Sequence, residues 1–123
     1  MDNPLIKDAS DQCFALLNLK NGWDSCDAKP IKLETVQTAV KFLNFIEAFV
    51  FETPLVIPMA MGGIQFEWSC EGYSLEIEIL EEGRIVAYFN GECDIEDCEI
   101  DVKKDLKSLV KAFSIIRRNK ENV

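Results

Sequence analysis

The segment 64–79 restricts the fold more than any other part of the chain, because it specifies both a β-hairpin and its register. Apolar and polar residues alternate in its two halves; the apolar ones are Ile64, Phe66 and Trp68, then Leu75, Ile77 and Ile79. A two-residue turn at Glu71-Gly72 places Trp68 opposite Leu75. Every apolar residue then meets an apolar partner on one face, so the register is self-consistent. We predict an antiparallel pair of strands with one buried face.

The other face of this hairpin is acidic. The same register places Glu67 directly opposite Glu76, and Gln65 opposite Glu78. Like charges directly opposite one another destabilise a sheet. We therefore take Glu67, Glu76 and Glu78 as candidate partner-binding residues that would meet lysine or arginine side chains of another protein. Two alternatives stay open. The face could simply be solvated, with salt or Arg84 offsetting its charge, or Glu67 and Glu76 could serve a carboxylate-based enzyme or a divalent-metal site.

Helical patterns lie on both sides of the hairpin. Apolar residues recur at helical spacing over 5–17, 36–50 and 102–116. Asn3 is suited to cap the first helix and Asn21-Gly22 to end it. Thr53-Pro54 stops the second helix, because proline disfavours helical geometry in the residue before it. The last helix is expected to have an acidic start and a basic end, which would both complement its dipole.

Two further strands are predicted, at 55–59 and 84–89. Pro58 cannot donate to a ladder, so the first of these is expected at a sheet edge. The register of the second is undecided, since Ile85, Ala87 and Phe89, or alternatively Val86 and Tyr88, could face the core.

These elements predict one domain, 1–123, of the α+β class. It comprises an antiparallel meander of about four strands, with two N-terminal helices and one C-terminal helix packed mainly on one face. A chain of 123 residues that is 48% hydrophobic can bury a core of its own. The loop 21–30 between the first two helices carries Trp23, which we expect to fold back on the core, and Asp24 and Asp27, which can accept from backbone amides.

The charge is unevenly distributed. The net charge is −9, and residues 61–101 hold 12 acidic side chains against one basic. Such a field favours a basic protein partner and disfavours nucleic acid. Histidine is absent, which removes Ser-His and Cys-His nucleophile pairs. We expect a non-enzymatic protein-binding module that needs no cofactor.

The acidic stretch 92–101 adds Asp94, Glu96 and Asp97 to the candidate partner-binding residues. It lacks the order of ligands found in a calcium-binding loop. Cys93 and Cys98 are spaced loosely for zinc, and no histidine or second cysteine pair completes a tetrahedral site. Five cysteines without an export signal indicate reduced thiols, and no apolar stretch approaches the roughly 20 residues of a membrane span. We expect a cytoplasmic protein that does not enter a membrane.

Residues 102–123 are basic, with seven Lys and Arg against two acidic residues. This helix could be a solvated face, or it could contact nucleic acid or an acidic partner. It could also pair with the acidic face of a second copy, which would make the chain a homo-oligomer and a self-associating structural module.

Two tryptophan motifs suggest a resemblance. They are Gly22-Trp23-Asp24 and Gly62-Gly63-Ile64-x-Phe66-Glu67-Trp68, with Ala28-x-Pro30, Ala39-x-x-Phe42-Leu43, Pro54 and Pro58 between them. Their order and spacing resemble a group of small, uncharacterised bacterial proteins with a Gly-Trp-Asp loop and a Gly-x-Ile-x-Leu/Phe-Glu-Trp strand. The resemblance covers about residues 20–90, and Ser25 departs from it where the group carries glycine. The group has no established activity, so the resemblance implies no catalytic residue. Small proteins of this kind can be one half of a two-gene module, such as a toxin and its neutraliser.

Overall fold

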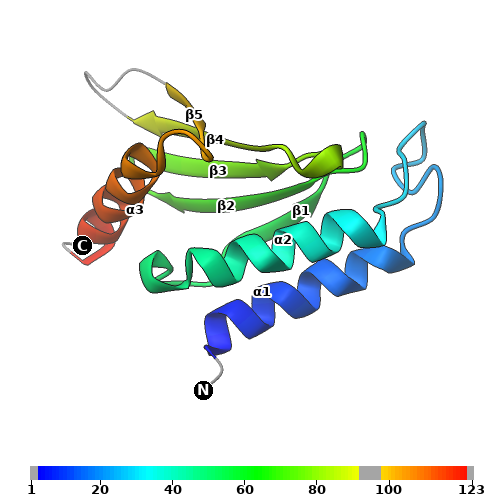
Figure 1. Cartoon of the computed structure of the whole chain (residues 1–123), viewed down its shortest axis with the longest axis horizontal. Helices are drawn as coiled ribbons and strands as arrows, with labels where there is room; N and C mark the ends of the chain where they lie inside the picture. The colour runs from blue at the N-terminus through cyan, green and yellow to red at the C-terminus, as the bar shows by residue number, and fades with distance from the viewer. Residues whose placement is uncertain (1–2, 92–97, 122–123) are drawn as a thin grey trace.

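The structure is a computed structural model that describes residues 3–91 and 98–121 (Figure 1). Its helices are α1 (Pro4–Ala15), α2 (Leu33–Phe45) and α3 (Leu106–Glu121), with short 3₁₀ turns at Leu16–Asn18, Glu47–Phe49 and Glu81–Gly83. Its strands are β1 (Leu55–Pro58), β2 (Ile64–Cys70), β3 (Tyr73–Ile79), β4 (Ile85–Gly91) and β5 (Cys98–Asp101). They form one antiparallel sheet in the order β1-β2-β3-β4-β5. The predicted α+β class is confirmed.

The predicted hairpin register is confirmed. Trp68 pairs with Leu75, Glu67 with Glu76 and Gln65 with Glu78. Strand β1 lies at an edge of the sheet, as Pro58 predicts. In β4 the undecided register is resolved, because Ala87 and Phe89 belong to the core while Val86 and Tyr88 alternate with them on the opposite face.

The strand count was too low by one. Residues 98–101, expected to belong to an acidic stretch before the last helix, form β5 and pair with β4. Ile100 of this strand joins the core. Ile100 stands between Glu99 and Asp101, and so short a segment in an acidic run gives no clear alternating pattern, so the sequence did not indicate a strand here.

All three helices pack against one side of the sheet (Figure 1). The sheet contributes alternate residues to the core, namely Ile64, Phe66, Trp68, Leu75, Ile77, Ile79, Ala87, Phe89 and Ile100. Trp68 lies near the centre of this core and is 1% exposed. Its ring packs edge-on against the ring of Phe113 in α3, with 4.9 Å between the ring centroids. Its indole N–H donates to the carbonyl of Glu52 at 3.0 Å. Among the described residues, no helix is long and apolar enough to cross a membrane.

The helix ends differ from the predicted ones in detail. Asn3 caps α1 as predicted, its Oδ1 accepting from the Leu5 amide at 2.9 Å. Helix α2 ends at Phe45, and a 3₁₀ turn replaces the expected last turn, although Ile46 and Val50 remain buried.

Helix α3 begins later than expected, because Asp101 holds a turn before it. The Asp101 carbonyl accepts from the amides of Lys104 and Asp105, at 3.0 and 2.8 Å. The first turn of α3 contains no acidic residue, so the expected acidic start is wrong. Asp105 instead precedes the helix and accepts from the amide and the hydroxyl of Ser108, at 3.1 and 2.7 Å. The bond from the Ser108 hydroxyl, and to a smaller extent the bond from its amide, hold the pKa of Asp105 below its ordinary value.

The loop between α1 and α2 is closed by its own side chains. The expectation that Trp23 folds back on the core is wrong, since it is half-buried and is not among the core residues. Its indole N–H donates to the Lys29 carbonyl at 2.7 Å, within the same loop. Asp24 accepts from the amides of Cys26 and Ala28, as predicted, whereas Asp27 is exposed and no cap by it is seen. Ser25, which stands where the resembled group carries glycine, has a φ of 66°. This is the left-handed region that glycine tolerates best.

Candidate functional site: the uncovered face of the sheet

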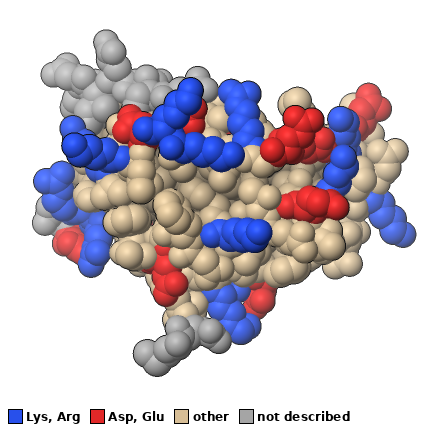
Figure 2. Space-filling view, viewed as in Figure 1, with Lys and Arg blue, Asp and Glu red and all other residues tan. Residues whose placement is uncertain are grey.

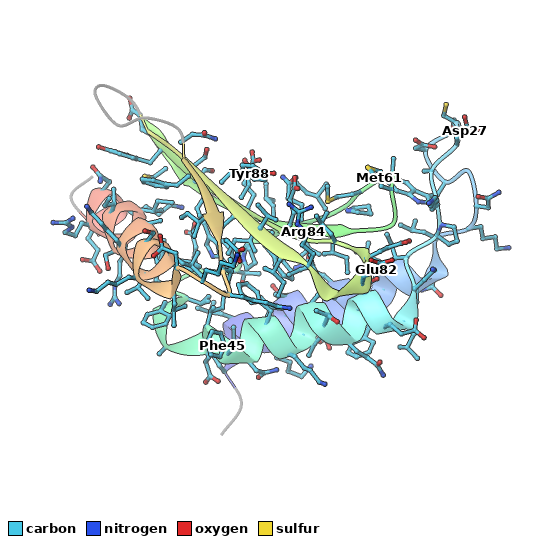
Figure 3. The ribbon with its side chains drawn as sticks, turned by 45° about the horizontal axis from the view of Figure 1, so that its top comes forward. Asp27, Phe45, Met61, Glu82, Arg84 and Tyr88 are labelled. Carbon is cyan, nitrogen blue, oxygen red and sulfur yellow. The ribbon has the colours of Figure 1, made fainter. Side chains whose placement is uncertain are left out.

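The face of the sheet turned away from the helices is the candidate functional site, and we call it the open face. One row across it is Leu55, Glu67, Glu76 and Tyr88, which are neighbours on β1 to β4. The adjacent row is Ile57, Gln65, Glu78, Val86 and Asp101. No helix among the described residues lies on this side (Figure 1). Figure 3 labels Tyr88 and Arg84 on it.

Two carboxylates of the open face oppose each other directly. Glu67 and Glu76 are cross-strand partners, and both are half-buried. Side chains in this relation start from Cβ atoms about 4.5–5.5 Å apart. Neither residue takes part in an ion pair within 3–91 and 98–121, and Arg84, which could have bridged them, takes part in none either. Among the described residues, therefore, no ion pair offsets the repulsion between these two glutamates.

Apolar side chains lie among the carboxylates of the open face. Val86 is 4% exposed although it lies on the face opposite the core. Leu55 is 61% exposed at the β1 edge, one position along its row from Glu67. Leu55 and the half-buried Tyr88 therefore add apolar and aromatic surface beside the carboxylates of the open face.

The structure brings together three of the six predicted partner-binding residues. Glu67, Glu76 and Glu78 share the open face. Asp94, Glu96 and Asp97 lie outside the described residues. Sequence reasoning missed Tyr88, Val86 and Asp101, which complete the two rows. The alternation of β4 would have identified Tyr88 and Val86 once its register was known, whereas Asp101 required the unexpected strand β5.

No metal centre is found among the described residues, where no group of three or more His, Cys, Asp or Glu is close enough to hold an ion.

The described thiols are also separate from one another. Cys13 is buried in the core, and this burial raises its pKa to about 12. Burial also raises the pKa of Cys70, against the opposing effect of the Lys120 ammonium, while Cys26 is exposed. Cys93 lies outside the described residues.

Comparison of the chain with models of protein families, with curated proteins and with solved structures found no match.

Proposed function

We propose that this chain is a non-catalytic binding domain that holds a basic segment of a partner protein against the open face. The observation that carries the proposal is the direct opposition of Glu67 and Glu76 on a sheet face that no described helix covers. A lysine or arginine placed between them would replace a repulsion with two attractions.

The remaining residues of the open face suit the same kind of partner. Glu78 and Asp101 add carboxylates in the neighbouring row, and Leu55 and Tyr88 offer apolar and aromatic surface. Arginine pairs with carboxylates through two parallel hydrogen bonds and also stacks on aromatic rings. A segment that is rich in arginine or lysine and carries one or two apolar residues therefore complements this face.

The same reasoning extends to the cellular compartment and the biological role of the domain. We take it to act in a cytoplasm, since the exposed thiol of Cys26 would be open to oxidation elsewhere. A small acidic domain that covers a basic segment would serve as the neutraliser in a two-gene module. Binding that blocks a basic active surface is the simplest way for such a neutraliser to work.

The experiment is affinity capture from the native host with three forms of the tagged chain. These are the wild type, the open-face variant Glu67→Lys/Glu76→Lys, and the control variant Asp8→Lys/Glu47→Lys. The control makes the same change in net charge at exposed positions on the helix side, outside every described ion pair. Capture is repeated at low and high salt.

We expect the wild type and the control to retain one stoichiometric basic protein that high salt releases, and the open-face variant to lose it. Equal capture by all three forms would place the contact elsewhere. Recovery of only the chain itself, at a mass that falls with salt, would instead favour the self-associating module. Circular dichroism of the open-face variant checks that it remains folded.

A further inference from the structure

A second surface of opposite character lies on the helix side of the sheet. It is a groove of about 460 Å³ between α2 and the start of α3, which we call the α2–α3 groove. Its apolar lining consists of Phe42, Phe45, Ile85, Val102 and Leu106. Phe42 and Val102 are buried, whereas Phe45 is 62% and Leu106 38% exposed. Figure 3 labels Phe45 at the end of α2.

The exposed walls of this groove indicate an interaction surface. Leaving a phenylalanine side chain in water forgoes about 1.5–3 kcal/mol of burial. Exposed apolar area that is continuous with an apolar cleft and bordered by charged groups is typical of a binding site. Here the border is formed by Lys41 on α2 and Lys103 on the turn before α3.

The charged side chains that line the α2–α3 groove are basic, although the chain as a whole is acidic and Glu82 and Asp101 line the neighbouring hollow beside Lys103. Both charged residues that line it are lysines, and neither forms an ion pair within the described residues. Lys41 has Gln37, Thr38, Asn44 and Phe45 at the helical positions three and four residues away, so no carboxylate of α2 lies beside it.

The start of α3 adds to this positive charge. The N-terminal end of a helix is itself the positive end of its dipole, and Lys107 lies in the first turn. Two described carboxylates oppose this charge: Asp105 accepts from the Ser108 amide, and Asp101 accepts from the Lys103 amide at 3.2 Å. In the space-filling view, basic side chains lie over α3 and beside a broad uncharged area, with acidic side chains among them (Figure 2).

We propose that the α2–α3 groove binds an acidic amphipathic segment of a partner protein. Apolar side chains of the segment would lie between Phe45 and Leu106, and its carboxylates would meet Lys41 and Lys103. A polypeptide segment fits better than a small amphiphile, because pockets for small ligands enclose about 70–90% of the ligand surface. A groove whose walls are this exposed would leave a small ligand open to water, whereas the rest of a partner protein would shield a bound segment from water.

The test is selection of random 16-residue peptides on the immobilised full chain, followed by anisotropy measurements with the synthetic consensus peptide. The groove variants are Lys41→Glu/Lys103→Glu and Phe45→Ala, and both change exposed side chains, so the fold is retained. The control Lys20→Glu/Lys29→Glu makes the same charge change at the far end of the molecule, around the α1–α2 loop. The open-face variant Glu67→Lys/Glu76→Lys is measured in parallel.

We expect a selected class that combines Leu or Phe with Asp or Glu. Its affinity should fall at least tenfold in each groove variant and remain unchanged in the control and in the open-face variant. An empty selection, peptides that the groove variants still bind, or displacement of the peptide by equimolar decanoate would each overturn the proposal. Selection of basic peptides alone, lost only in the open-face variant, would support the proposed function and refute this inference, so the two fail separately.

Discussion

Replacing Trp68 by alanine tests whether the core is organised around this residue. The side chain is 1% exposed. A buried tryptophan removes roughly 200 Å² from water, which at about 25 cal/mol per Å² corresponds to at most about 5 kcal/mol. The substitution also leaves a cavity beside Phe113 and removes the donor to the Glu52 carbonyl. Measured tryptophan-to-alanine changes in cores cost about 3–5 kcal/mol, and we expect a loss in that range.

The assay is urea unfolding followed by far-UV circular dichroism, with the midpoint and the slope fitted separately. Because domains of this size are stable by about 5–15 kcal/mol, the alanine variant retains little stability and could be partly unfolded. Trp68→Phe provides the second measurement. It keeps an aromatic ring against Phe113 and loses the indole hydrogen bond, so a loss of about 1–3 kcal/mol is expected.

A loss below about 1 kcal/mol for Trp68→Ala, at an unchanged slope, would refute the reasoning. It would mean that Trp68 is accessible to solvent and that α3 does not close the core against β2. A loss in Trp68→Phe as large as in Trp68→Ala would assign the effect to the hydrogen bond instead of the packing.

Three further predictions concern single residues. Ser25→Gly should raise the free energy of unfolding by about 0.5–1 kcal/mol, because φ is 66° there, and Ser25→Ala should give no such gain. The Cys13 thiol, with its pKa raised to about 12, should resist iodoacetamide in the native state while exposed Cys26 reacts. In the unfolded state the Cys13 thiol ionises near pH 9, so above that pH the unfolded state binds fewer protons than the folded state. Stability should then fall by about 1.4 kcal/mol per pH unit between pH 9 and 12, with a shallower fall in Cys13→Ala. Glu76→Gln should stabilise the domain by about 0.2–1 kcal/mol, and 1 M salt should largely remove the gain. A destabilising Glu76→Gln would show that the two glutamates do not repel.

The hairpin was predictable because it is local. Its register follows from the alternation on each side of Glu71-Gly72, and a slip of one residue would turn Trp68 and Leu75 out of the core. The edge position of β1 followed from Pro58 for an equally local reason. The part of the open face that lies on the hairpin was therefore predictable from the sequence, since the pairing of Glu67 with Glu76 is part of that register.

The remaining features depend on contacts between distant residues. Strand β5 pairs with the edge that β4 offers, and Ile100 of its own sequence joins the core. The helical spacing from Val102 onward is real, yet Asp101 turns the chain before α3 can begin. The α2–α3 groove combines residues from α2, from β4 and from 102–106, so no single segment of the sequence could indicate it.

The opposed glutamates allow the solvated-face and binding interpretations to be separated by one substitution. If the open face is simply solvated, Glu76→Gln raises stability and has no other consequence. If the face holds a basic segment, the same substitution raises stability and weakens binding, because the carboxylate that strains the free sheet is the one that pairs in the complex. Stability and affinity then change in opposite directions, and no general effect of the substitution on folding could produce that result.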